Sequence, residues 1–320
     1  MATYKEIKGT QIEVLASDPS NPVEGQVWYN STSNVLKGQA ATAVGAWATG
    51  GALNTARTNI SGAGTIPAFV AFGGQSGATV YAQTELYNGS SWTEVNDLNT
   101  GRYALGGNGT QTSALAFGGT PPATAATELW NGTNWTEVND LNAARAYVDG
   151  AGADNTSALA IGGDPAPSGQ TELWNGTNWT EVNDLTTARA QMGAAGIATA
   201  ALAFGGYPIT GKTESWNGSN WTEVNVLNTG RSDPGGAGTN TAALAFGGYN
   251  GTARVAVTET WNGTNWTEEA DLSTARNGLA GDGDTNTSAL AVGGEGPPVT
   301  AATEEWTGAG AGLTRTFTDS

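Results

Sequence analysis

The chain repeats one short sequence six times, and this repeat constrains the fold more than any other feature. The repeat is clearest in WNGTNWTEVNDLNAAR (Trp130–Arg145), and near copies recur with a period of about 44 residues. A fixed period of this length is typical of proteins in which one structural unit packs on the next, such as propellers and solenoids. The repeat therefore indicates an architecture, while the function has to be inferred from particular side chains.

Each unit carries the same landmarks in the same order. An apolar run ends in Gly-Gly, a Thr-Glu pair follows, and an aromatic residue stands three residues after that Thr. A Trp comes five residues later, and an Arg comes ten residues after the Trp. The recurring Arg positions are Arg57, Arg102, Arg145, Arg189, Arg231 and Arg276, and the second Trp recurs at Trp92, Trp135, Trp179, Trp221 and Trp266.

The pattern within each unit predicts an all-β fold. Runs such as SALAFGG are short, apolar and closed by glycines, which is typical of buried strands. Asn-Gly between TELW and NWTEV is a strong hairpin signal, because both residues tolerate positive φ. About four strands fit in each unit, as in a propeller blade. The Trp pairs supply bulk between blades.

The two ends of the repeat region complement each other. The last copy has no second Trp after Trp306, but WATGGALNTAR places Trp47 ten residues before Arg57. We therefore expect the strand around Trp47 to pair with the C-terminal strands. Such pairing closes a ring and leaves no open sheet edge. The sequence predicts six four-stranded blades in a closed ring.

This order of landmarks resembles the kelch repeat. ALAFGG, TELWNGTNW and DLNAAR carry the likeness, which covers residues 47–320. The resemblance implies a six-bladed kelch-like β-propeller over residues 47–320, with residues 1–46 as a separate N-terminal hairpin segment and linker. The aromatic spacing is tighter than in the kelch pattern, which suggests shorter outer strands.

Composition excludes several classes of function. The net charge of −17 argues against binding nucleic acid through its phosphates. No apolar stretch approaches the length of a membrane span, and MATYKEIKGTQIEV lacks the apolar region of a conventional signal peptide. The acidic chain is expected to be soluble.

The chain contains neither Cys nor His. Without these residues the usual zinc and copper ligand sets are missing, and so are Ser-His-Asp and Cys-His nucleophiles. A copper oxidase on a kelch-like propeller is excluded for the same reason. The sequence therefore predicts no cofactor, no zinc or copper site and no catalytic residue based on His or Cys.

Carboxylates are the remaining catalytic candidates. A Glu recurs in every Thr-Glu pair, and another recurs after the second Trp in five units. A glycoside hydrolase needs two carboxyl groups in different environments, whereas repeated residues occupy equivalent ones. We interpret the glutamates as structural, paired with the recurring Arg, because buried charges require such partners.

The six Arg residues allow two interpretations. They are half of the twelve basic residues, so a duplicated structural role is one explanation. The other is a ring of cations near the axis that holds an anionic sugar or a carboxylate. Six equivalent copies favour the structural interpretation of the Arg residues. We interpret the recurring Trp residues as structural too.

One face of the predicted propeller collects the differences between units. The gap from Gly-Gly to Thr-Glu varies from 8 to 11 residues, whereas the gap from Arg to Gly-Gly is 16 or 17 throughout. In a four-stranded meander the variable loop lies on the same face as the connection between blades. Variable loops on a rigid scaffold often carry recognition. The candidate ligand-binding residues on this face are Tyr103, Tyr147, Asp164, Tyr207, Tyr249 and Arg254.

Asp282-Gly-Asp284-Thr-Asn286 resembles the start of a calcium-binding loop. The Gly and the terminal Glu of such a loop do not follow in register. The sequence therefore leaves calcium binding open and assigns no metal ligand.

The N-terminal segment carries a second resemblance. PVEGQVWYN followed by NVLK is similar to a module near the N-termini of tailed-phage fibre and other virion proteins, where Pro-x-x-Gly-Gln precedes an aromatic strand and Asn-x-Leu. The resemblance covers about 25 residues and implies virion attachment, with Trp28 and Tyr29 as the aromatic residues of the attachment strand.

Together these features predict a non-enzymatic phage tail fibre or appendage. Its expected partners are other virion proteins, through the N-terminal segment, and a host surface glycan or protein, through the propeller. The expected location is the virion, after assembly in the host cytoplasm. The alternatives are a bacterial kelch-like lectin or interaction scaffold and, third, a carboxylate-based glycan hydrolase. The sequence does not identify the receptor. It does not determine the oligomeric state either, and a homo-oligomer is one of the alternatives.

Overall fold

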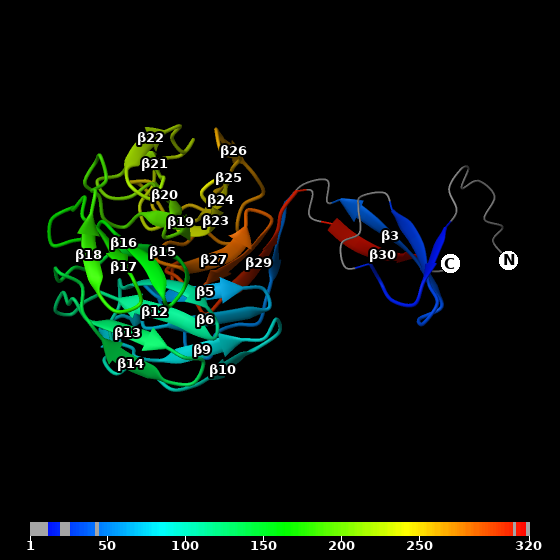
Figure 1. The fold of residues 1–320 in the computed structure, drawn as a ribbon, viewed down its shortest axis with the longest axis horizontal. Helices are drawn as coiled ribbons and strands as arrows, with labels where there is room; N and C mark the ends of the chain where they lie inside the picture. Colours follow the sequence, from blue (N-terminus) through cyan, green and yellow to red (C-terminus); the bar gives the residue numbers. More distant parts are fainter. Residues whose placement is uncertain (1–11, 20–25, 42–44, 310–311, 318–320) are drawn as a thin grey trace.

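The computed structural model describes residues 12–19, 26–41, 45–309 and 312–317 of the chain (Figure 1). All regular elements in these ranges are β-strands, as the sequence predicts. The strands form seven four-stranded sheets and one two-stranded sheet. The architecture is all-β, with repeated four-stranded antiparallel sheets, and is compatible with a β-propeller.

Six of the four-stranded sheets, the repeat sheets, contain the landmarks of the repeat. The first consists of β5 (Ser61–Thr65), β6 (Ala68–Phe72), β9 (Thr84–Tyr87) and β10 (Trp92–Glu94). The second consists of β11 (Gly106–Thr110), β12 (Ser113–Phe117), β13 (Thr127–Trp130) and β14 (Trp135–Val138). The third consists of β15 (Asp149–Asp154), β16 (Ser157–Ile161), β17 (Thr171–Trp174) and β18 (Trp179–Val182).

The remaining repeat sheets follow the same order. The fourth consists of β19 (Gly193–Ile197), β20 (Ala200–Phe204), β21 (Thr213–Trp216) and β22 (Trp221–Val224). The fifth consists of β23 (Gly235–Thr239), β24 (Ala242–Phe246), β25 (Thr258–Trp261) and β26 (Trp266–Glu268). The sixth consists of β27 (Ala280–Thr285), β28 (Ser288–Val292), β29 (Thr303–Thr307) and β4 (Ala46–Thr49). Strands β7 (Gln75–Ser76) and β8 (Thr79–Val80) form the two-stranded sheet.

The sixth sheet joins the two ends of the repeat region. Strand β4 pairs antiparallel with β29, and Trp47 lies opposite Trp306. Every other repeat sheet takes its four strands from one continuous stretch of chain. The strand around Trp47 therefore supplies the fourth strand that the last copy of the repeat lacks.

The first strands of the repeat sheets lie around the centre of the body in Figure 1, each against the next, and β27 contacts β5. Their small residues permit this close approach. A Cβ atom added at Gly107 would lie 2.6 Å from the Phe72 ring, and one added at Gly150 would lie 2.7 Å from the Phe117 ring. The many glycines of the sequence thus allow neighbouring sheets to pack near the axis.

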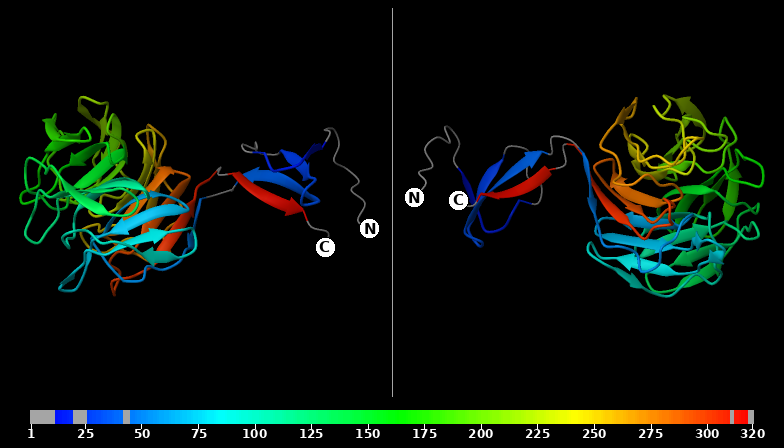
Figure 2. Two further views of the ribbon diagram at one scale, coloured as in Figure 1. Left: turned by 60° about the horizontal axis from the view of Figure 1, so that its bottom comes forward. Right: turned by 180° about the vertical axis from the view of Figure 1, so that it is seen from behind.

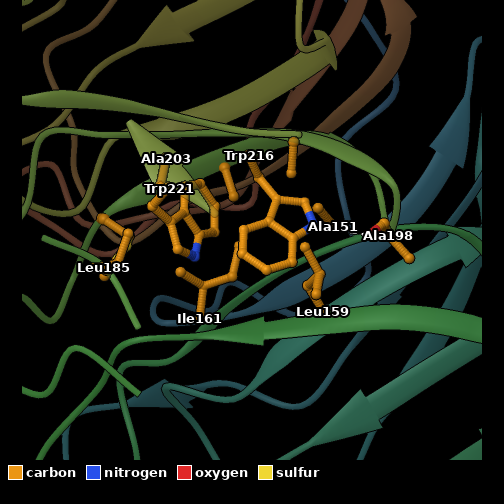
Figure 3. Packing of buried hydrophobic residues seen from close by; sticks show 11 residues of the cluster. Ala151, Leu159, Ile161, Leu185, Ala198, Ala203, Trp216 and Trp221 are labelled. Carbon is orange, nitrogen blue, oxygen red and sulfur yellow. Dashed lines mark hydrogen bonds between the residues drawn. The ribbon is translucent and has the colours of Figure 1, made fainter. Parts of the chain in front are cut away.

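Tryptophans fill the space between neighbouring sheets. Figure 3 shows the indoles of Trp216 and Trp221 beside Leu159 and Ile161 of the third sheet. The two rings lie with centroids 5.3 Å apart at an interplanar angle of 42°. Equivalent Trp pairs occur at Trp130 with Trp135, Trp174 with Trp179, and Trp261 with Trp266. The repeated aromatic residues are therefore core residues.

The second Trp of each unit also donates a hydrogen bond to the preceding repeat sheet. The indole Nε1 of Trp135 donates to Oγ1 of Thr84 at 2.9 Å, and that of Trp179 donates to Thr127 at 3.0 Å. The same bond joins Trp221 to Thr171, Trp266 to Thr213, Trp47 to Thr258 and Trp92 to Thr303. Each repeat sheet is thus bonded to the one before it, and the first is bonded to the sixth.

The seventh four-stranded sheet, the terminal sheet, raises the number of such sheets above the predicted six. It consists of β1 (Glu13–Leu15), β2 (Val27–Asn30), β3 (Val35–Ala41) and β30 (Gly312–Phe317). Strands β2 and β3 form the hairpin that the sequence predicts. Strand β30, which the sequence assigned to the propeller, pairs along β3 instead. Figure 2 shows this sheet apart from the six repeat sheets.

Candidate binding face

The recurring Arg and Glu residues form buried ion pairs within each repeat sheet. In the third sheet Nη2 of Arg145 lies 2.7 Å from Oε1 of Glu172, and both side chains are buried. The other pairs are Arg57–Glu85, Arg102–Glu128, Arg189–Glu214, Arg231–Glu259 and Arg276–Glu304. Burial lowers the pKa of Arg145, and the neighbouring Glu172 counteracts this effect. These arginines do not form an exposed ring of cations.

Each buried glutamate has a second partner besides its arginine. Oε2 of Glu172 accepts hydrogen bonds from the backbone N–H and the side-chain amide of Asn142, both at 2.7 Å. Arg145 donates further to the carbonyls of Gly162 and Gln170. The charges are therefore compensated inside the sheet, as buried charges require. This arrangement fits the structural interpretation of the repeated Arg and Glu.

The two variable segments of each unit meet on one face. The residue after each Arg forms a bridge with the residue after Gly-Gly in the same sheet, as Tyr103 does with Thr120 and Ala190 with Tyr207. Equivalent bridges join Thr58 to Gln75, Ala146 to Asp164, Ser232 to Tyr249 and Asn277 to Glu295. We call the face that carries these bridges and the adjoining loops the loop face.

The candidate ligand-binding residues all lie on the loop face, but they do not converge on one point. Tyr207 is 50% exposed and Tyr249 is 37% exposed. Nε of Arg254 donates to Oδ1 of Asn277, and its guanidinium pairs with Glu295. Tyr103, Tyr147 and Asp164 are partly buried, and only Tyr147 of the six candidates lines the cavity described below.

Six residues on the loop face form a ring of backbone hydrogen bonds around the axis. The N–H of Tyr147 donates to the carbonyl of Ala104 at 2.7 Å, and the N–H of Asp233 donates to Gln191 at 2.7 Å. The cycle is completed by Ala104 to Asn59, Gln191 to Tyr147, Gly278 to Asp233 and Asn59 to Gly278. We call these six residues the mouth ring; each stands two positions after a recurring Arg.

The mouth ring opens onto a cavity of about 110 Å³ between the first strands of the repeat sheets. All six mouth-ring residues line this cavity, together with Asn108, Asp149 and Asp282 from strands β11, β15 and β27. The lining contains no Lys or Arg. The cavity is thus a polar space with acidic side chains along the axis.

Three carboxyl groups of the lining have raised pKa values. Burial raises the pKa of Asp149, Asp233 and Asp282 to about 7 in each case. Backbone N–H groups oppose this effect at Asp282, whose carboxylate accepts from Gly64 and Gly283. The charge of the cavity therefore changes near neutral pH.

The sequence analysis did not single out Asn59, Gln191 or Asp233. These positions differ from unit to unit, although each stands two positions after a recurring Arg. The differences between units are visible in the sequence, but only the structure shows that the six positions meet at the axis. The variable loop lengths instead indicated residues at the edge of the same face.

The segment that resembles a calcium loop lies beside the axis. Asp282 binds backbone N–H groups, as described above, and Asp284 is exposed. The described residues contain no group of three or more acidic, His or Cys side chains that could hold a metal ion. The geometry thus assigns no metal ligand here.

Trp28 and Tyr29 lie on β2 of the terminal sheet. Trp28 is fully buried, and its Nε1 donates to Asp18 at 3.1 Å. Asp18 also accepts from Asn30 and Lys37, and the hydrogen bond from Lys37 is the main cause that lowers its pKa to about 2. Trp28 therefore belongs to the core of this sheet, while Tyr29 is partly exposed.

No protein-family model and no curated protein matches the chain. Within the described ranges, no helix is long and apolar enough to cross a membrane. The inferences below therefore depend on the residues and on their geometry.

Proposed function

We propose that the six repeat sheets are the blades of a closed, six-bladed kelch-like propeller and that the terminal sheet is a separate module. Two cycles of hydrogen bonds support the closed ring: the Trp–Thr bonds between neighbouring sheets and the backbone bonds of the mouth ring. Both run through all six repeat sheets and return to the first. The pairing of β4 with β29 supports the same arrangement.

We propose further that the protein is a non-enzymatic structural component of a phage virion, a tail fibre or appendage. The terminal sheet attaches it to the particle, and the loop face of the propeller recognises a glycan or protein on the host surface. The likeness of PVEGQVWYN to virion proteins supports the first part, and the variable residues on the loop face support the second.

The observation that supports this proposal is the position at which the chain leaves the repeat sheets for the terminal sheet. Strand β29 begins beside the loop of residues 293–302 on the loop face and runs away from it to Thr307, which lies opposite Ala46 of β4. The next residue, Gly308, donates to Thr287 in the turn between β27 and β28, at the opposite end of the sheet. Both connections to the terminal sheet therefore start from the face opposite the loop face, which leaves the loop face free to bind.

Immunogold electron microscopy on purified virus particles from the source sample tests the proposal, with an antibody against residues 47–320. We expect label at one defined site on the particle. Unlabelled particles, with label on cells or in the medium, would contradict a virion role and would favour a cellular lectin or interaction scaffold built on the same loop face.

A further inference from the structure

The mouth-ring position holds a different residue in each of the six units. The units share their Arg, Gly-Gly, Thr-Glu and Trp positions, yet the residue two positions after Arg is different in every unit. In chain order these residues are Asn59, Ala104, Tyr147, Gln191, Asp233 and Gly278. A purely structural position in a duplicated unit would be expected to keep one residue, as the Arg position does.

The backbone conformation of the mouth ring is one that favours glycine over other residues. All six residues have positive φ, for example 52° at Tyr147, 54° at Gln191 and 50° at Asp233. Glycine adopts this conformation readily, as Gly278 does at a φ of 61°, whereas other residues cost roughly 1–3 kcal/mol each when strained. Asn59 and Asp233 are residue types that tolerate positive φ, whereas Ala104, Tyr147 and Gln191 retain side chains in a conformation that favours glycine. The side chains at these three positions therefore indicate a role other than folding.

The charges around the mouth ring favour a ligand that is not anionic. The lining carries three Asp residues, and Asp164 and Glu295 lie close enough to Asp233 to raise its pKa. Within residues 26–38 and 45–309, every Lys and Arg side chain is in an ion pair. An anionic ligand would face these carboxyl groups without a Lys or Arg in the described lining, whereas hydroxyl or amino groups would find acceptors.

One buried polar atom of the cavity lining lacks a hydrogen-bond partner among the described residues. Asn108 is 4% exposed, and its Oδ1 has no hydrogen-bond partner among the described residues, while its Nδ2 donates to the carbonyl of Asp154. A buried acceptor without a partner is costly unless a water or a ligand satisfies it. Asn108 lines the cavity below the mouth ring, so a donor that enters from the loop face can reach this part of the molecule.

We propose that the mouth ring binds one non-anionic sugar residue of a host glycan, with a hydroxyl or amino group inserted into the axial cavity. Asp233 and the amides of Asn59 and Gln191 hydrogen-bond to the sugar, and Tyr147 packs against its ring. A water-sized group needs about 10–15 Å³, so the cavity of about 110 Å³ has room for the inserted polar arm of the sugar. This inference rests on the proposed recognition of a host glycan and names the site and the class of sugar.

The test uses the full-length chain and three immobilised oligosaccharides: oligoglucose, oligoglucosamine and oligogalacturonate. We expect binding to the neutral or the amino compound and none to the acidic one. Tyr147→Gly and Asp233→Gly should each weaken this binding at least tenfold, while thermal stability stays equal or increases. Asn34→Gly is the matched control, since it makes the same exchange at a residue of positive φ (56°) that is exposed in the terminal sheet, outside the mouth ring, and it should bind as the parent does.

Each other outcome overturns the inference in a different way. Preference for oligogalacturonate would show that the ligand class is wrong. Undiminished binding by the Tyr147 and Asp233 variants would place the site elsewhere on the protein. A parent protein that labels bacterial cells of the source sample but binds none of the three oligosaccharides would overturn the sugar site and keep the proposed function. A parent protein that labels no cells would contradict the proposed function itself.

Discussion

The indole N–H of Trp92 donates to the hydroxyl of Thr303 at 3.1 Å, although the two residues are 211 positions apart in the chain. The same bond joins Trp135 to Thr84 and Trp179 to Thr127 in neighbouring sheets. The first and sixth repeat sheets are therefore joined by the contact that joins every other neighbouring pair. This contact leads directly to the first prediction.

We expect strand β4 to be essential for folding and the terminal sheet to be dispensable. Removing residues 1–40 deletes β1, β2 and most of β3 but leaves β4, so cooperative thermal unfolding should persist within a few degrees of the full-length chain. Removing residues 1–56 deletes β4, exposes the edge of β29 and should cause aggregation or loss of cooperative unfolding. Equal melting curves for the two truncations would contradict the role of β4.

The buried ion pairs should respond very differently to single and double replacement. Glu172→Leu leaves Arg145 buried without its partner and should destabilise the protein by about 3–5 kcal/mol. The double variant Arg145→Met with Glu172→Leu removes both charges and should recover much of that loss. Urea unfolding of the three proteins measures the effect. A double variant less stable than Glu172→Leu alone would show that Arg145 stabilises the fold mainly through its bonds to backbone carbonyls.

The Trp–Thr bonds between sheets should each contribute modestly. Trp179→Phe and Thr127→Val each remove one partner of a buried hydrogen bond and should each cost about 1–3 kcal/mol. The double variant should cost less than the sum of the two, because the second change removes a group that is already unpaired. A double-mutant cycle by chemical denaturation measures this coupling, and strictly additive losses would contradict a direct bond.

Asp233 should make stability depend on pH. Burial, together with Asp164 and Glu295, raises its pKa from 3.8 to about 7, so the folded state holds a proton that the unfolded state has released. Its contribution is therefore fully present below about pH 4 and is lost as the pH rises to about 7. Asp233→Asn should remove this part of the pH dependence and should raise stability at pH 8 by on the order of 4 kcal/mol relative to its effect at pH 4. Thermal melts at both pH values measure the difference, with the exposed Glu137→Gln as control. Equal effects of Asp233→Asn at both pH values would show that Asp233 is ionised in the folded protein near its ordinary pKa.

Much of this architecture could be predicted because the repeat fixes local patterns. The spacing of Trp47 from Arg57 indicated the missing strand, and the recurrence of Thr-Glu with Arg indicated a buried ion pair. These predictions succeed because residues that recur in all six units occupy equivalent positions in the fold. Periodicity therefore identifies the residues of the scaffold well.

The remaining features depend on contacts that periodicity does not report. Strand β30 comes from GLTRTF, a segment without the landmarks of the repeat, and its partner β3 is more than 270 residues away. The mouth ring was missed for a related reason, since Asp233 and Tyr147 share neither residue type nor sequence neighbours. Only the path of the backbone around the axis brings them together.

The identical junctions between repeat sheets make the units interchangeable. A recombination event that swaps, moves or replaces one whole unit keeps each Trp opposite a Thr and each Arg beside a Glu. It changes the order and identity of the mouth-ring residues without disturbing the core. A gene with this organisation can therefore change the residues that line the axial cavity in single steps, without a change of fold.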